Sequence, residues 1–160
     1  LGGVILGSTA LIRETVEPYM KHTGGSMSPF TAWMMVKSLE TIDLRVRAQT
    51  ATALALAEAL ADHPKLHRMI YPGHCSHPQH ALVKQQMGEG GTVLSIDVAG
   101  GQEATFKFLN ALQIVIISNN LGDAKSIATH PSTTTHQRLP EAQKNYFGHH
   151  TRIGQTEYRT

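Results

Sequence analysis

The chain has 160 residues and a mass of 17.4 kDa, enough for one domain or for one small domain with a piece of another. A hydrophobic content of 41% with 16% charged residues is typical of a globular protein with a core. The formal net charge is +2, and the 14 lysines and arginines are scattered without a basic run. Composition therefore argues against nucleic acid or an anionic membrane as the main partner.

Cysteine content and apolar runs bear on the compartment. The single cysteine, Cys75, excludes an internal disulfide framework and suits a reducing environment, so we expect a cytoplasmic protein. No apolar run approaches the roughly 18 residues that a membrane span needs, and the start has no signal-peptide pattern. The sequence opens at Leu1 in what resembles a strand already under way, which predicts that the chain is a piece of a longer protein.

The first predicted elements are a strand and a helix. An apolar run over residues 4–6 predicts a short buried strand. Ser8 or Thr9 is then placed to cap a helix, because its side-chain oxygen accepts from an N–H of the first turn. That helix is predicted over residues 10–20, with Pro18 near its end.

A loop rich in glycine and serine, residues 23–30, leads into the longest helical pattern. Ser28 is placed as N-cap and Pro29 as the first helical position. From Pro29 to about Ala61 we expect one helix whose apolar stripe packs in a core, ending at Asp62-His63-Pro64. The stripe is spaced alternately four and three residues apart: Met35, Leu39, Ile42, Val46, Thr50, Ala53, Ala57 and Leu60.

Strand-like and helix-like segments then alternate. The expected strands cover residues 66–71, 94–98, 114–117 and 125–129, and the expected helices cover residues 78–87 and 102–112. The run over residues 114–117 is continuously apolar and β-branched, as in a buried central strand. The pattern predicts an α/β fold in which helices cover a small sheet that is entered through a long helix.

A polar loop, Ser118–Leu139, follows this central strand. Asn119 and Asn120 carry amides that donate and accept, and residues 132–135 add four hydroxyls in succession. His130-Pro131 favours an extended conformation at His130. A polar loop at the end of a buried strand is where α/β proteins tend to bind small ligands. The alternative is a solvated surface loop, and composition alone does not separate the two.

Other kinds of site find little support. His74, His77 and His80 are spaced by three with Cys75 between them, and these are residue types that bind zinc. Pro78 lies among them where a turn meets a helix start, which opposes convergence on one ion, so we expect no metal site. The chain has neither a Gly-x-Ser-x-Gly elbow nor a Gly-x-Gly-x-x-Gly fingerprint, so a hydrolase triad and a nicotinamide cofactor are unsupported.

The sequence of the polar loop also resembles a segment found in a known family. Asn120-Leu-Gly-Asp-Ala-Lys-Ser126, then His130-Pro131 and Thr134-Thr-His-Gln137, is similar to the Cys/Met-metabolism family of pyridoxal-phosphate enzymes. That family includes cystathionine synthases and lyases, methionine γ-lyase and homoserine sulfhydrylases. The segment is most similar to the sulfhydrylases, since the synthases and lyases usually have serine where Asn120 stands. Further ordered matches cover about residues 1–148: residues 1–7, 23–32, 39–45, 71–73, 76–80, 86–87 and 108–112.

The resemblance implies the C-terminal part of a fold-type I enzyme that binds pyridoxal 5'-phosphate. Residues 1–42 would end the large cofactor domain, and residues 43–160 would form the smaller C-terminal α/β domain. The implied activity is that of a homoserine-ester sulfhydrylase, which makes homocysteine from an activated homoserine ester and sulfide in methionine biosynthesis. The implied assembly is a homo-oligomer, a dimer or a tetramer. The alternatives are cystathionine γ-synthase, cystathionine lyase and methionine γ-lyase, or, in another class, a non-catalytic module for small-ligand binding or assembly.

The resemblance also implies site residues. Asn119, Asn120 and Leu121 would line the substrate-carboxylate side of the pocket, because family members place a serine and neighbouring backbone there. Thr135 matches the threonine before histidine in the family loop and would belong to the pocket wall.

Two departures from the family pattern limit what this chain does alone. The Schiff-base lysine of the family lies before Leu1, and Lys125 stands at an unrelated position. The family's carboxylate-clamping arginine lies in an apolar strand that residues 149–160 do not match, so Arg152 is not assigned that role. We therefore expect no catalytic residue in this chain, and neither a covalent bond to the cofactor nor turnover by this chain alone.

Overall fold

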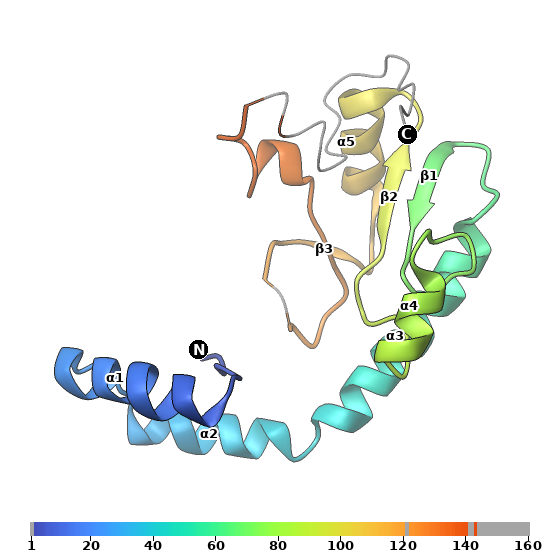
Figure 1. Cartoon of the computed structure of the whole chain (residues 1–160). Coiled ribbons are helices and arrows are strands. Elements are labelled where there is room, and N and C mark those ends of the chain that lie inside the picture. Colours follow the sequence, from blue (N-terminus) through green and yellow to red (C-terminus); the bar gives the residue numbers. More distant parts are fainter. Residues whose placement is uncertain (1, 121, 141–142, 144–160) are drawn as a thin grey trace. The chain divides into compact units, whose positions relative to one another are not determined.

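The computed structural model describes residues 2–120, 122–140 and 143 of the chain. It contains two compact units, Leu1–Thr52 and Ala53–Thr160 (Figure 1). None of the helices in the described part combines the length and the apolar character that a membrane span needs. The division predicted between residues 42 and 43 concerns the domains of a whole enzyme, and it stays a prediction.

The first unit begins with two helical segments in direct succession. A π-helical segment, η1 (Leu11–Val16), runs into α1 (Glu17–Thr23). The Ser8 hydroxyl accepts a hydrogen bond from the Leu11 N–H at 3.2 Å, so of the two expected caps Ser8 makes this bond. Helix α1 ends at Gly24, whose φ of 73° is a left-handed conformation that glycine adopts without a Cβ penalty.

The expected strand over residues 4–6 is not formed. Val4, Ile5 and Leu6 have no strand structure and are 80%, 62% and 84% exposed. A strand exists only where a second backbone exchanges hydrogen bonds with it, and no described residue supplies one here. An apolar run alone does not create this partner, so the prediction from apolarity was wrong.

Helix α2 (Pro29–Leu39) starts as the sequence predicts. Ser28 is its N-cap, and the Ser28 hydroxyl accepts from the Thr31 N–H at 3.2 Å. The expectation of one helix as far as residue 61 was wrong, because Glu40 and Thr41 form a turn before α3 (Ile42–Leu60) begins.

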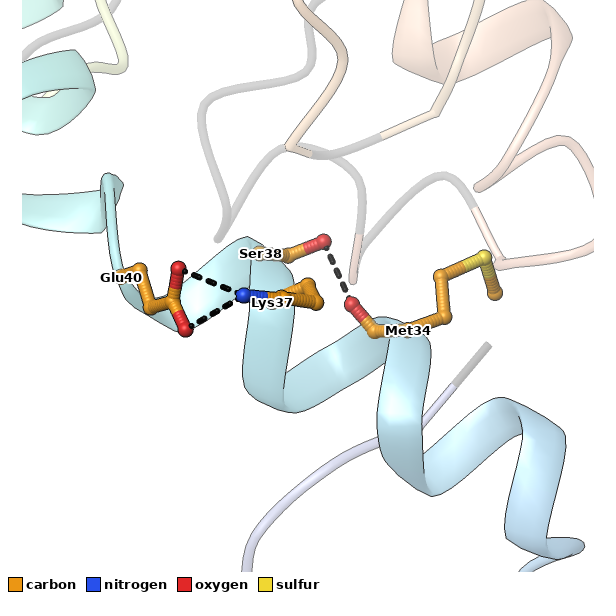
Figure 2. Close-up of polar contacts among 4 residues, drawn as sticks. All are labelled: Met34, Lys37, Ser38 and Glu40. Carbon is orange, nitrogen blue, oxygen red and sulfur yellow. Dashed lines mark hydrogen bonds and ion pairs between the residues drawn. The ribbon is translucent and has the colours of Figure 1, made fainter.

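Local polar contacts account for this break (Figure 2). The Ser38 hydroxyl donates back to the Met34 carbonyl at 2.9 Å, a contact that tends to bend helices. Lys37 pairs with Glu40 at 3.0 Å just beyond the last turn. The guanidinium of Arg45 then donates to the Ser38 carbonyl at 2.7 Å and so satisfies a helix end that has lost its next turn. Apolar periodicity contains no information on these side-chain bonds.

The expected apolar stripe is buried only along part of its length. Thr50, Ala53 and Ala57 on α3 are 4%, 6% and 0% exposed. Leu39 and Ile42, earlier on the same stripe, are 56% and 44% exposed. The spacing therefore identified the packing face of α3 but not the point at which burial starts.

The core of the second unit joins α3 to an antiparallel strand pair. Strands β1 (Leu66–Ile70) and β2 (Ser95–Val98) pair with Met69 opposite Ile96, and a register shift lies between Leu66 and Arg68. The buried cluster comprises Ala53, Ala57, Met69 and Tyr71, with Ala61, Leu94 and Ile96 packed against it. Both strands were predicted, over residues 66–71 and 94–98, and each is one residue shorter than expected.

Tyr71 anchors the loop that precedes β2. Its ring is 1% exposed, and its hydroxyl donates to the Gly91 carbonyl at 2.8 Å. Burial, with a smaller effect from the Glu89 carboxylate, raises the pKa of Tyr71 above its usual 10.0. Beside the ring, the backbones of Gly73 and Gly90 approach so closely that a Cβ on Gly90 would lie 2.3 Å from the Gly73 nitrogen.

Both predicted helices of this unit are formed, the first shorter than expected and the second shifted by one residue towards the N-terminus. Helix α4 (His80–Gln86) follows β1, and α5 (Gly101–Ala111) lies beside β2 (Figure 1). Helix α5 begins after Gly100, whose φ of 101° favours glycine, and it buries Leu109.

The remaining two strands form a separate sheet. Strands β3 (Ile116–Ile117) and β4 (Ile127–Ala128) pair in parallel, and a short 3₁₀ helix, η2 (Pro131–Thr133), follows. The described residues thus contain two two-stranded sheets where one was expected. Ile116 and Ile117 are 46% and 55% exposed, so the expected buried central strand was also wrong. Within the described part, β4 is the one backbone paired with β3.

Candidate functional site

The polar loop is built around the parallel pair β3–β4. The Ile116 N–H donates to the Ser126 carbonyl at 2.9 Å, and the Ser118 N–H donates to the Ala128 carbonyl at 3.0 Å. Parallel strands have their carboxyl ends at the same edge of a sheet. The segments that follow β3 and β4 therefore leave from one edge, and this edge is where α/β sheets tend to bind small ligands. We call residues 118–125 the first arm and residues 129–136 the second arm.

The first arm is shaped by two local bonds. The Asn120 N–H donates to the Ser118 hydroxyl at 3.4 Å, and the Lys125 N–H donates to the Asp123 carboxylate at 3.0 Å. Gly122 lies between them with a φ of 80°. Each bond closes a short local turn in which a side chain holds the backbone, one over residues 118–120 and one over residues 123–125.

The predicted binding residues of the first arm are accessible. Asn119 and Asn120 are both exposed, and among the described residues neither side-chain amide has a hydrogen-bond partner. Leu121 lies outside the described residues. Two uncommitted amides on an ordered turn are able to donate to an anionic ligand such as a carboxylate.

The second arm is dense in hydroxyl contacts. The Thr134 hydroxyl donates to the His130 carbonyl at 2.8 Å and lies 3.1 Å from the Thr129 hydroxyl. Ser132 is only 5% exposed. Thr135, the predicted wall residue, is exposed, and its hydroxyl lies 2.8 Å from Nδ1 of His136. The grouping of Thr135 with Asn119 and Asn120 in one pocket wall stays a prediction, although both arms leave the same edge.

His130 is the residue that sequence reasoning missed. Its Nδ1 lies 2.8 Å from the Thr133 hydroxyl, and its Nε2 lies 3.5 Å from the Ser132 hydroxyl. The rings of His130 and of Phe106 on α5 pack edge to face, with their centroids 5.3 Å apart. Burial lowers the pKa of His130 below its usual 6.5. In the sequence, His130 was notable only as the residue before Pro131, and nothing local indicates burial against a helix 24 residues earlier.

The histidines of residues 74–80 are used locally. Nδ1 of His74 accepts from the Ser76 N–H at 3.2 Å, and Nδ1 of His77 accepts from the Gln79 N–H at 3.2 Å. Nδ1 of His80 lies 3.2 Å from a backbone carbonyl. The described residues contain no group of three histidine, cysteine, aspartate or glutamate side chains that could hold a metal ion.

Comparison with known proteins identifies the family. The sequence model of the Cys/Met metabolism PLP-dependent enzymes matches residues 1–153. The chain belongs to this family. It is 44% identical to the O-succinylhomoserine sulfhydrylase of Pseudomonas aeruginosa over 87% of this chain and 34% of that protein. It is 45% identical to the O-succinylhomoserine sulfhydrylase of Mycobacterium tuberculosis over 89% of this chain and 36% of that protein. The chain thus spans about a third of the length of these relatives.

A solved structure confirms the predicted fold class. The cystathionine gamma synthase from Xanthomonas oryzae pv. oryzae, in complex with aminoacrylate and cysteine, has a TM-score of 0.83 at 28% identity. The match covers 89% of this chain and 37% of that one. The described chain is a fragment of a fold-type I enzyme with mixed helices and small sheets. The family is pyridoxal-phosphate dependent, so the predicted cofactor class is confirmed as well.

The lysines of the described part lie on the surface of this chain. All six described lysines are exposed: Lys21, Lys37, Lys65, Lys84, Lys107 and Lys125. Lys37 and Lys107 pair on the surface with Glu40 and Glu103 at 3.0 and 2.8 Å. Within the described residues, the polar groups of the two arms therefore lie at one sheet edge, and the lysines lie on the surface.

Proposed function

We propose that this chain is the C-terminal part of a pyridoxal-phosphate-dependent homoserine-ester sulfhydrylase. The enzyme would replace the γ-acyloxy group of an activated homoserine ester with sulfide, which gives homocysteine and a free carboxylate in methionine biosynthesis. The observation that carries the proposal is the parallel β3–β4 pair, which sends two polar arms from one edge. The identity to O-succinylhomoserine sulfhydrylases and the asparagine at position 120 support the sulfhydrylase over other members of the family.

In this proposal the first arm binds the substrate carboxylate. The amides of Asn119 and Asn120 donate to its oxygens, and the bonds at Ser118 and Asp123 hold the turn that presents these amides. A hydrogen bond to a charged group contributes about 1.5–3 kcal/mol. When bound, the cofactor would supply the electron sink for the substrate carbanion. The chain's own task is to orient the amino acid.

The same arms are compatible with other activities of the family. A cystathionine γ-synthase takes cysteine as the sulfur donor, whereas a cystathionine lyase or methionine γ-lyase eliminates the sulfur group. The similarity to a solved cystathionine gamma synthase makes cystathionine γ-synthase the second candidate. A non-catalytic binding or assembly module is the candidate from another class.

The proposal includes a cytoplasmic homo-oligomer, a dimer or a tetramer. Phe30, Trp33 and Val36 on α2 are 69%, 59% and 59% exposed, and apolar surface of this kind supports an assembled state. The single cysteine, Cys75, supports a reducing compartment. Sedimentation velocity on the enzyme that contains this chain measures the assembly, and a monomer would contradict it.

A product competition decides the activity. The enzyme that contains this chain is loaded with pyridoxal phosphate and given O-succinylhomoserine or O-acetylhomoserine with equal concentrations of sulfide and cysteine. Mass spectrometry of the products is expected to show mainly homocysteine. Predominant cystathionine would reassign the enzyme as a γ-synthase. In a separate reaction with methionine or cystathionine as the substrate, release of a ketoacid would reassign it as a lyase. If no substrate gives a product, the non-catalytic module is the remaining candidate.

A further inference from the structure

We propose that His130 is a positioning residue for the second arm: its imidazole bridges Ser132 and Thr133 and so fixes the course of the backbone that places Thr135 at the substrate edge. The effect on substrate binding rests on the proposed function. The bridge itself is a property of this chain and is testable without the cofactor.

The first step of the argument is that His130 contacts three consecutive hydroxyl side chains. The two ring nitrogens reach Thr133 at 2.8 Å and Ser132 at 3.5 Å, and the backbone carbonyl of His130 accepts from Thr134 at 2.8 Å. Thr135 follows directly, so its position depends on how this turn is held.

The second step concerns the tautomer. The Thr133 hydroxyl has one proton, and its oxygen lies 2.8 Å from Nδ1 and 3.4 Å from the His130 carbonyl. Both contacts are satisfied when Nδ1 carries the ring proton and donates to Thr133, while Thr133 donates to the carbonyl. Nε2 then has a free lone pair, which accepts from the Ser132 hydroxyl. This arrangement gives a buried hydroxyl, 5% exposed, its partner.

The third step is that the ring is held from outside the loop. The edge-to-face contact with Phe106, at 84° between the ring planes, comes from α5, which packs beside β2. Burial also favours the neutral form of the ring, because it lowers the pKa of His130 below its usual 6.5. The bridge thus attaches the second arm to the helix that packs on the core. The His136 N–H, which donates to the Pro131 carbonyl at 2.8 Å, closes the turn beyond Thr135.

Nuclear magnetic resonance on this chain tests the bridge directly. A long-range proton–nitrogen spectrum at neutral pH is expected to show His130 as the neutral ring with Nδ1 protonated. In His130→Ala, amide exchange at His136 is expected to become about tenfold faster or more, while exchange at Met69 in β1 is unchanged. His130→Asn retains a donor near the position of Nδ1 and is expected to stay within about threefold of the parent chain. The matched control is His67→Ala, since His67 is exposed on β1.

Kinetics on the enzyme that contains this chain test the consequence. His130→Ala is expected to raise KM for the homoserine ester about tenfold with a smaller change in kcat, and His130→Asn is expected to recover most of the loss. Unchanged exchange at His136 in His130→Ala overturns the bridge. An Nε2-protonated ring also overturns it, and this result stands even if the alanine variant fails to fold, because the spectrum is recorded on the parent chain. Faster exchange with an unchanged KM overturns the link to substrate. An unsubstituted enzyme that converts no homoserine ester refutes the proposed function instead.

Discussion

The contact between Gly73 and Gly90 makes a sharp prediction about stability. A Cβ added at Gly90 would lie 2.3 Å from the Gly73 nitrogen, 2.4 Å from the Gly73 Cα and 2.9 Å from the Tyr71 ring. Two of these atoms belong to the backbone, so no side-chain rotation relieves the overlap. Gly90→Ala therefore forces the loop away from β1 or distorts the turn after Tyr71.

The size of the effect follows from what has to move. Overpacking of a packed site costs about 1–3 kcal/mol. A shift of the loop also lengthens the 2.8 Å bond from the Tyr71 hydroxyl to the Gly91 carbonyl, which contributes about 1 kcal/mol. We expect Gly90→Ala to lower the free energy of unfolding by about 2–4 kcal/mol.

Gly88→Ala is the matched control because it lies in the same loop and its Cβ would meet nothing within 4 Å. The control is expected to leave stability unchanged or to raise it by up to about 1 kcal/mol, since alanine restricts the unfolded chain. Urea unfolding followed by circular dichroism measures both variants. Equal midpoints for Gly88→Ala and Gly90→Ala would refute the close approach of the two backbones.

Three further predictions concern the cap, the histidine and the lysines. Ser28→Ala is expected to destabilise by about 0.5–2 kcal/mol, and Ser28→Asp by less because it keeps the acceptor; equal losses in urea unfolding would contradict the cap. The pKa of His130 is lower in the folded than in the unfolded chain, so its contribution to stability is present above pH 6.5 and is lost as the pH falls through the folded pKa. Urea unfolding measured from about pH 7.5 to 5 is expected to show a larger loss in the free energy of unfolding for the parent chain than for His130→Asn. Parallel pH profiles would refute the lowered pKa of His130. After reduction of the purified chain with pyridoxal phosphate and borohydride, peptide mapping is expected to find no stoichiometrically labelled lysine. One fully labelled lysine would show a covalent cofactor site on this chain.

Much of the fold could be predicted because it depends on local signals. Ser28 before Pro29 specifies a helix start through one side-chain bond, and the alternation of Leu94, Ile96 and Val98 with polar residues specifies a half-buried strand. These signals lie within a few residues of the elements that they determine, so the elements appear with bounds close to those expected.

The errors all involve partners distant in sequence or side-chain bonds outside the apolar pattern. Residues 4–6 and 116–117 are apolar enough for buried strands, but burial requires neighbours that apolarity does not provide. The helix break at Glu40 depends on bonds of Ser38 and Arg45 that apolar periodicity does not contain.

The candidate site divides in the same way. The polar composition of the two arms and the resemblance of their sequence to the family predicted Asn119, Asn120 and Thr135 as site residues. His130 was missed because its role depends on Phe106, a residue on another element. The parallel pairing that brings the arms to one edge is likewise a tertiary feature that no single stretch of sequence specifies.

The central claim is that the first arm faces the substrate, and the KM of an Asn120 variant tests it most directly. In the enzyme that contains this chain, Asn120→Ala removes the amide that we propose donates to the substrate carboxylate. Loss of about 1.5–3 kcal/mol raises KM for the homoserine ester roughly 10- to 150-fold. Asn120→Ser, the residue usual in the synthases and lyases, is expected to recover part of this loss. Asn110→Ala, an exposed asparagine on α5, is the control and is expected to leave KM unchanged. A KM for Asn120→Ala equal to that of the control would contradict the account.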